Sequence, residues 1–305
     1  MVHSVIDIGT NTILLLIAQK SYDSDFNVLH DEHNISRLGS GIVKKGEISK
    51  DAFDRVENFL KRYIFLSEQF NVDKIISVGT SGLRSATNRN EFLIEMKNRT
   101  GLDISILSGL EEAEGSYIGG LYDLNVKEDY RVLIDIGGGS TEVVYGFGNK
   151  IIDKISIEIG AVKIKEKFYI EQPIDKKVIY QARYFIREKF SEIFDIPGNP
   201  TFVGVAGTVT TLGEMEHTTN KNIPKEVNGK ILTIENVRNL SFILNLLDIN
   251  RIKKIPQVNP ERADLLPAGS LILEEYMNKF KINELVVSTS GLRYGVMKNS
   301  FMNFT

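Results

Sequence analysis

The chain has 305 residues, of which 42% are hydrophobic and 25% charged, so it can form about two domains that each bury an apolar core. It contains no cysteine, which excludes disulfides, thiolate nucleophiles and zinc–thiolate sites. Its four histidines lack metal-ligand spacing, so a bound metal should be a hard cation held by oxygen. The net charge of −3 gives no global attraction to a nucleic-acid polymer or an anionic membrane. No apolar stretch is long enough to span a bilayer and no signal sequence precedes the first apolar run, so we expect a cytoplasmic protein.

Short apolar segments that read as strands open each half of the chain in the same way. They lie at 5–9, 12–18 and 26–30 in the first half and at 132–137, 141–147 and 150–157 in the second. In both groups the first strand ends in Asp-Ile-Gly, and turn-forming residues separate the second strand from the third. Two such openings about one domain apart indicate an internal duplication.

A helix is predicted after each opening. Apolar residues recur at helical spacing over 49–70, where Ser49 can act as N-cap, and over 176–194. Each half then returns to a short apolar strand, at 75–78 and 202–205. Strands that alternate with helices favour layered α/β domains.

The repeat places the domain boundary near residue 125. We therefore expect a first domain over 1–125 and a second over 126–305, with the C-terminal helix as a candidate to pack back on the first.

A glycine-rich turn follows the first strand of each half. The first contains Gly9, Thr10 and Asn11, and the second contains Gly137, Gly138, Gly139 and Ser140. Such turns expose successive backbone N–H groups that can bind phosphate oxygens. The alternative is that both are tight hairpin turns that need positive φ. The repetition favours a phosphate chain clamped between two domains.

Carboxylates stand beside these turns. Asp135 ends a strand, so its carboxylate should project into the cleft, where Mg²⁺ could neutralise phosphate oxygens while keeping much of its water. Asp7 and Glu142 could join through water, and the alternative for Asp7 is a carboxylate that stabilises the turn. Mn²⁺ is an alternative metal, and a monovalent cation such as K⁺ is a further candidate.

A third candidate lies in S-G-L-E-E-A-E-G-S-Y-I-G-G at 108–120. Ser108 and Glu111 form a capping box, which gives Glu111 a structural role, whereas Glu112 has none. Glu112 is therefore a candidate general base for an attacking water, the alternative being a solvated helix face. Gly115 and Gly119 predict a small-residue face that lets this helix approach another backbone closely.

Further polar groups could hold a polyanion. Gly207 and Thr208 supply N–H and hydroxyl donors, unless they form a plain strand-to-helix turn. Basic residues beside glycine-rich segments could neutralise charge, with ordinary surface ion pairs as the alternative. They are Arg37, Arg84, Lys163, Arg262 and Arg293.

These motifs in this order resemble the exopolyphosphatase and guanosine pentaphosphate phosphohydrolase (Ppx/GppA) family, a branch of the actin-like ATPase superfamily. The similar segments include D-I-G-T-N-T, V-G-T-S-G-L-R, S-G-L-E-E-A, D-I-G-G-G-S-T-E, G-V-A-G-T-V-T-T-L and E-R-A-D-L-L-P-A-G, and they cover essentially the whole chain. The resemblance implies an α/β fold of two actin-like (ribonuclease H-like) domains that face a central cleft. It also implies Mg²⁺-dependent release of a terminal phosphate, with Glu112 as catalytic base and Asp135 with Glu142 at the metal. The two glycine-rich loops match the family's phosphate binders, and Arg84 is a candidate among them.

The sequence departs from the family pattern at two places. Asn228 stands where family members commonly carry histidine, and the chain ends soon after the last actin-like motif, whereas long members add a helical domain.

The resemblance favours inorganic polyphosphate as substrate, with pppGpp as the alternative on the same site. A kinase of the same superfold and a non-catalytic alarmone sensor or filament protein are the other classes. A homodimer is a candidate assembly, and neither a nucleic-acid polymer nor a membrane is expected as partner.

Overall fold

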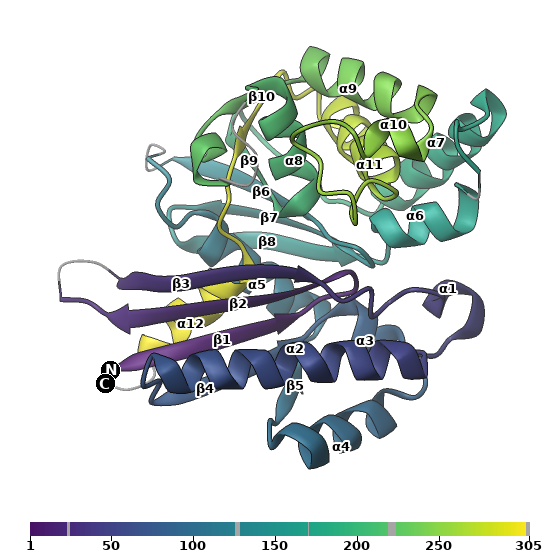
Figure 1. Cartoon of the computed structure of the whole chain (residues 1–305). Helices are drawn as coiled ribbons and strands as arrows, with labels where there is room; N and C mark the ends of the chain where they lie inside the picture. Colours follow the sequence, from purple (N-terminus) through teal and green to yellow (C-terminus); the bar gives the residue numbers. More distant parts are fainter. Residues whose placement is uncertain (23–24, 126–128, 170, 219–223, 303–305) are drawn as a thin grey trace.

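The computed structural model describes residues 1–22, 25–125, 129–169, 171–218 and 224–302, and its strands form two sheets (Figure 1). The first sheet contains β1 (Val2–Ile8), β2 (Thr12–Lys20), β3 (Phe26–Ile35), β4 (Lys74–Gly79) and β5 (Ile104–Ile106). The second contains β6 (Tyr130–Ile136), β7 (Thr141–Phe147), β8 (Lys150–Ile157), β9 (Thr201–Val205), β10 (Ile231–Thr233) and β11 (Glu284–Val287). Every strand predicted from the sequence is therefore present.

Both sheets have the same topology. The order is β3-β2-β1-β4-β5 in the first and β8-β7-β6-β9-β11 in the second, where β10 is added at the edge. In each sheet the first three strands are antiparallel, and the next strand pairs parallel to the first, as β4 does with β1 and β9 with β6. The shared topology confirms the α/β class and the internal duplication.

Helices cover the outer faces of both sheets, and two further helices lie between the sheets (Figure 1). Those of the first half are α1 (Ile42–Lys45), α2 (Lys50–Gln69), α3 (Ser81–Ser85), α4 (Arg89–Thr100) and α5 (Gly109–Gly120). Those of the second are α6 (Ala161–Phe168), α7 (Lys176–Phe190), α8 (Ala206–Glu216), α9 (Ile234–Leu246), α10 (Ile249–Ile252), α11 (Leu266–Lys279) and α12 (Leu292–Met302), with a 3-10 turn at Pro224–Val227.

The two helices predicted from periodicity are present, and one is shorter than expected. Ser49 caps α2, because its hydroxyl accepts a hydrogen bond from Ala52 N at 3.3 Å. α7 ends at Phe190, four residues before the predicted end, and Ile193 is buried in the core from the turn that follows. The apolar pattern in the sequence extends beyond the end of the helix because the following turn also contributes a side chain to the core.

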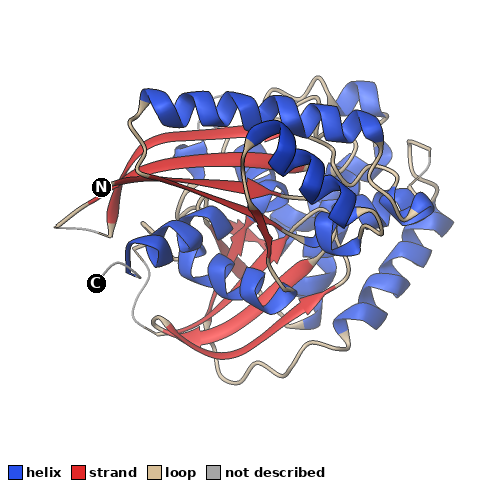
Figure 2. Ribbon diagram, turned by 90° about the horizontal axis from the view of Figure 1, so that it is seen from below, coloured by secondary structure: helices blue, strands red, loops and turns tan. Residues whose placement is uncertain are grey.

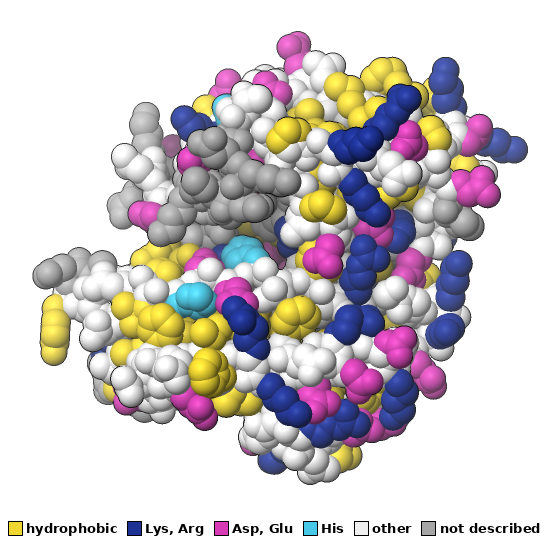
Figure 3. Space-filling model, viewed as in Figure 1, with side chains coloured by type: hydrophobic (Ala, Val, Ile, Leu, Met, Phe, Trp, Pro, Cys, Tyr) yellow, Lys and Arg dark blue, Asp and Glu magenta, His cyan; other side chains and the backbone are white. Residues whose placement is uncertain are grey.

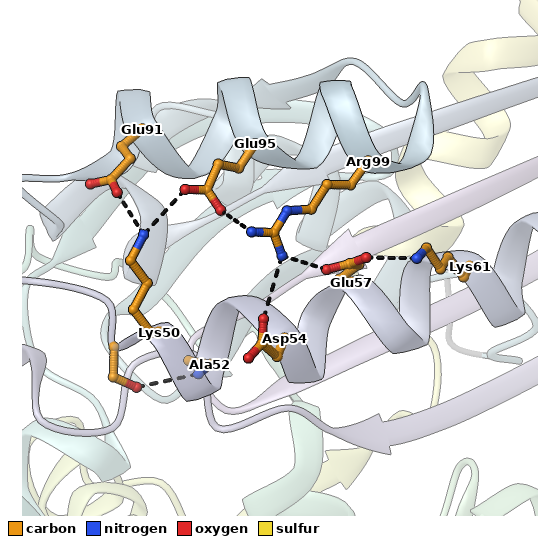
Figure 4. Close-up of polar contacts among 9 residues, drawn as sticks. Lys50, Ala52, Asp54, Glu57, Lys61, Glu91, Glu95 and Arg99 are labelled. Carbon is orange, nitrogen blue, oxygen red and sulfur yellow. Dashed lines mark hydrogen bonds and ion pairs between the residues drawn. The ribbon is translucent and has the colours of Figure 1, made fainter.

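Charged side chains line the contact between α2 and α4 (Figure 4). Arg99 bridges Glu57 and Glu95 at 2.6 Å each, and Lys50 lies between Glu91 and Glu95. Because most of these groups are exposed, the pairs add little net stability and weaken with salt. The edge-to-face contact of two buried rings beneath them holds the helices more firmly.

Two helices separate the sheets, with α5 packed on β6 to β9 and α12 packed on β1 and β2. Figure 2 shows the last helix beside the first strands. A Cβ on Gly119 would lie only 2.0 Å from Gly291 O, and a Cβ on Gly295 would lie 2.0 Å from Gly115 O. The predicted small-residue face of α5 is therefore confirmed, because only glycine allows these two backbones to lie so close.

No described helix is both long and apolar enough to cross a membrane.

Candidate active site

A cavity of about 200 Å³ lies where the loops after β1 and β6 meet. The loops are close enough that a Cβ on Gly138 would lie 3.0 Å from Thr10 Cβ, and one on Gly139 would lie 2.8 Å from Thr10 Oγ1. Most residues predicted for the site line this cavity. They are Asp7, Gly9, Thr10, Asn11, Glu112, Asp135, Gly137, Gly138, Gly139, Ser140, Gly207 and Thr208.

Each glycine-rich loop closes a hairpin and faces the cavity. Gly9 N donates to Thr12 O at 2.8 Å, and Gly137 N donates to Ser140 O at 3.0 Å. No glycine of the two loops has a positive φ, so the alternative that these turns need left-handed backbone is wrong. Gly139 is required for space instead, because a Cβ there would lie 2.6 Å from Ser81 Oγ and 2.8 Å from Thr10 Oγ1.

Four carboxylates converge at the cavity and behind it. Glu112, Asp135 and Asp7 line the cavity, whereas Glu142 pairs with Asp135 across β6 and β7 and is fully buried. Ser116 Oγ donates to Asp135 Oδ2 at 2.6 Å. Two of the four are thus held by one strand pair, and Glu112 is brought to them by α5.

Burial disfavours the charge on these carboxylates. It raises the pKa of Glu112 to about 8, where the Arg84 charge opposes the shift and the neighbouring carboxylates add to it. Burial likewise raises the pKa of Asp7 to about 7, and it raises the pKa of both Asp135 and Glu142. Such a cluster favours binding of a cation, because a cation stabilises the ionised form of every group.

Glu112 is held by one ion pair. Arg84 Nη1 donates to Glu112 Oε2 at 2.5 Å and to Leu107 O at 2.9 Å. Arg84 was predicted to bind phosphate, but it does not line the cavity in this structure, and its other terminal nitrogen is buried without a partner. The neighbouring Glu111 forms the predicted capping box with Ser108, so that structural role is confirmed.

The donor set fits a magnesium ion that shares its coordination with substrate. Among the described residues, no three His, Asp or Glu side chains are placed to hold a metal by themselves. Mg²⁺ commonly takes only one or two carboxylates and completes its shell with water and phosphate oxygens. Asp7 Oδ1 is buried without a hydrogen-bond partner, and Asp135 accepts only the Ser116 hydroxyl among the interactions of the described part of the chain. These two carboxylates are the ones that could hold the ion, and Glu142 lies behind them.

The pentapeptide T-S-G-L-R occurs at 80–84 and again at 289–293, and both copies contribute to the cavity, although only their arginines were singled out from the sequence. Thr80 and Ser81 come from the first copy, and Thr289 and Ser290 from the second. The repeat itself was the signal that could have identified them.

Asn228 supports the second copy. Its side chain accepts from Thr289 N at 3.1 Å and donates to Asp123 O at 3.0 Å. At the position where family members commonly carry histidine, this asparagine thus links the cavity wall by hydrogen bonds to the segment that connects the two sheets.

The basic residues singled out earlier have different environments. Arg262 lines the cavity, and its side chain makes no hydrogen bond or ion pair with the residues that the structure describes. A Cβ on Gly207 would lie 2.0 Å from Arg262 Nη1, so this glycine makes room for the guanidinium. Lys163 pairs with Glu158, as a surface lysine commonly does.

Arg293 is fixed by partners on β3. It donates to both carboxylate oxygens of Asp31, at 3.0 and 2.9 Å, and contacts His33 Nε2 at 2.9 Å. Burial opposes the charge on Asp31, yet the Arg293 pair holds the pKa of Asp31 well below its usual range. This buried pair joins the start of α12 to the first sheet.

Comparison with known proteins gives a consistent result. The sequence model described as the Ppx/GppA phosphatase family matches residues 16–304. The chain is 28% identical to exopolyphosphatase 2 of Mycobacterium tuberculosis, over 96% of each protein. It is 29% identical to a bifunctional 3-dehydroquinate synthase/phosphatase of Fusobacterium nucleatum, over 98% of this chain but only 46% of that protein, so it spans about half of that relative.

A solved structure of an Aquifex aeolicus member of the Ppx/GppA family is similar throughout. It is 30% identical, covers 99% of this chain and 98% of its own, and superposes with a TM-score of 0.84.

Proposed function

Because the chain belongs to the Ppx/GppA phosphatase family, we propose that it is a phosphoric anhydride hydrolase that releases terminal orthophosphate from inorganic polyphosphate. The observation that carries this proposal is the position of Glu112, a buried carboxylate that lines the same cavity as two glycine-rich loops. A relative of similar length is named an exopolyphosphatase, which supports the substrate.

The cavity lining favours a bare phosphate chain over a nucleotide. Among the described residues that form it there is no Phe, Tyr or Trp on which a guanine base could stack. Glycine, serine and threonine dominate the lining instead, together with the guanidinium of Arg262. Such groups bind phosphate oxygens and carry no information about a base.

Water attack requires a group that takes its proton. Glu112 would accept that proton as the water oxygen bonds to the terminal phosphorus and the bridging P–O bond breaks, with the electron pair going to the departing chain. Arg84 keeps Glu112 oriented and favours its ionised form against burial. The protonated Glu112 can then return its proton to solvent.

The loops bind the anion during this step. The backbone N–H groups of Thr10 and Asn11 and those of residues 138–140 would offer donors to the terminal phosphates, whereas the N–H groups of Gly9 and Gly137 donate within their own hairpins. Mg²⁺, with Mn²⁺ as the alternative, would be held by Asp135 and Asp7 and would supply charge neutralisation of the phosphate oxygens.

The test is phosphate release by the purified protein with Mg²⁺, compared among long-chain polyphosphate, tripolyphosphate, pppGpp and ATP. We expect the highest kcat/KM on polyphosphate. A higher kcat/KM on pppGpp would instead assign the guanosine pentaphosphate phosphohydrolase activity. Transfer from ATP to an acceptor, or tight binding of pppGpp with turnover of none of the four compounds, would contradict a hydrolase.

A further inference from the structure

One carboxylate at the rim of the cavity is shared by two cations from opposite halves of the chain. Asp264 Oδ1 accepts from Arg37 Nη2 at 3.3 Å, and Asp264 Oδ2 accepts from Lys165 Nζ. Arg37 lies in the loop after β3, Lys165 on α6, and Asp264 just before α11. The three residues therefore bridge the two halves next to the cavity.

The chain around this triplet is part of the cavity wall. Arg37 N donates to Asn11 O at 3.0 Å, so its backbone is bonded directly to the first glycine-rich loop. On the other side, Asp264 lies between Arg262 and Leu265, which both line the cavity. A phosphate chain that leaves the cavity would therefore meet the triplet.

The triplet is poorly explained as a purely structural bridge. The Arg37 and Lys165 side chains are 43% and 33% exposed, and ion pairs of such accessibility contribute little net stability. A separate contact already joins the same two segments, because Glu166 Oε1 accepts from Gly41 N at 2.6 Å. Arg37 Nη2 also donates to Glu261 O at 2.9 Å, a backbone contact that holds the guanidinium in place when the Asp264 carboxylate moves away.

More positive charge surrounds the triplet. The short helix α1 ends with Lys44 and Lys45, both exposed and without a described ion pair, and it contacts α6. Figure 3 shows Lys and Arg side chains, with Asp and Glu among them, on the side where α1 and α6 meet. Lys44 and Lys45 thus add positive charge that no described ion pair compensates, which favours an anionic ligand at this side.

We propose that Arg37 and Lys165 form a subsite for the phosphates of a longer polyphosphate chain that project from the cavity, and that these phosphates displace the Asp264 carboxylate. This inference rests on the proposed polyphosphatase function and adds a preference for chains long enough to reach the rim. Displacement costs little, because the carboxylate is replaced by another anion and becomes free to be solvated.

Binding measured without turnover tests the subsite. The dissociation constants of long-chain polyphosphate and of tripolyphosphate are measured by calorimetry in EDTA for the wild type, Arg37→Gln, Lys165→Gln and Asp264→Asn. Lys61→Gln on α2 is the matched control, because it removes an exposed, paired lysine away from the cavity. Phosphate release by the wild type from both substrates is measured in parallel with Mg²⁺.

The proposal predicts that replacing the cations and replacing the carboxylate of the triplet change the affinity for long-chain polyphosphate in opposite directions. Arg37→Gln and Lys165→Gln should each weaken long-chain binding about two- to fivefold more than tripolyphosphate binding. Asp264→Asn should strengthen long-chain binding by a similar factor, because the competing carboxylate is gone. Lys61→Gln should change neither ratio.

Other outcomes overturn the subsite or the proposed function separately. If Asp264→Asn weakens binding of both substrates as the two cation variants do, the triplet is only a bridge and the subsite is wrong. If the wild type releases phosphate but no variant changes the ratio, the subsite again fails while the proposed function stands. If the predicted ratios appear but no phosphate is released, the polyphosphatase function fails and the subsite stands.

Discussion

Replacing Gly119 by alanine places a methyl group in the contact between α5 and α12. The new Cβ would lie 2.0 Å from Gly291 O, 2.6 Å from Gly295 N and 2.9 Å from Gly291 C. All three are backbone atoms, so no side chain can rotate away. A Cβ contact must be at least 3.0 Å, so the nearest distance has to grow by 3.0 − 2.0, which is about 1 Å.

The magnitude follows from two opposing effects. Alanine is better than glycine in a helix by up to about 1 kcal/mol, whereas overpacking costs about 1–3 kcal/mol and more where backbones collide. Because three backbone atoms collide at once, we expect a net loss of about 2 kcal/mol in the free energy of unfolding. For a chain of 305 residues, with an unfolding entropy of about 2.1 cal/mol/K per residue, that loss lowers Tm by about 3 °C. α5 also carries Glu112, and a displacement of about 1 Å at a catalytic group can lower the rate up to about 100-fold.

Thermal unfolding followed by circular dichroism, together with phosphate release, measures both effects. Gly291→Ala is the matched stability control, because a Cβ there meets nothing within 4 Å although it lies in the same contact. A Gly119→Ala protein as stable as the wild type would refute the close approach of the helices. An equal loss of Tm in Gly119→Ala and Gly291→Ala would show that the loss does not come from the collision of the Gly119 Cβ with the facing backbone.

Three further predictions concern the cavity. Asp135→Ala should abolish Mg²⁺-stimulated phosphate release, and full wild-type activity in excess EDTA would contradict the metal assignment. In EDTA, Tm should fall from about pH 5 to about pH 8 and then level off. The reason is that folded Asp7 and Glu112, with pKa values of about 7 and about 8, retain protons that the unfolded chain loses near pH 4. Mg²⁺ should flatten this dependence, and a Tm that rises from pH 5 to pH 8 would refute the raised pKa values. Asn228→Ala should lower kcat about three- to tenfold through the loss of support for Thr289, at a cost of about 1 kcal/mol in stability, and an unchanged kcat would remove Asn228 from the cavity wall's support.

Features set by neighbouring residues could be predicted from the sequence. The hairpins after β1 and β6, the Ser49 cap and the capping box of Ser108 with Glu111 each depend on a few adjacent residues, and each is present. The duplication was also visible, because both copies kept Asp-Ile-Gly at the end of the first strand. Local chemistry therefore gave the strand order within each opening.

Contacts between distant segments could not be derived in the same way. The glycines of α5 predicted a close neighbour but not its identity, since nothing near Gly119 in the sequence points to Gly291. Arg84 looked like a phosphate ligand because it stands beside glycine, yet the packing of α3 against the start of α5 pairs it with Glu112. The roles assigned to the loop residues and to the metal carboxylates remain predictions for the experiments above.

The most direct test of the account compares Glu112→Gln with Glu111→Gln in turnover and in polyphosphate binding. Both changes replace a carboxyl group by an amide at adjacent positions of α5, but only Glu112 lines the cavity, while Glu111 caps the helix. We predict that Glu112→Gln lowers kcat by about 10²- to 10⁴-fold with binding retained, and that Glu111→Gln has a much smaller effect on kcat, because its loss mainly weakens the cap. Near wild-type turnover by Glu112→Gln, with inactivation by Glu111→Gln, would contradict Glu112 as the general base.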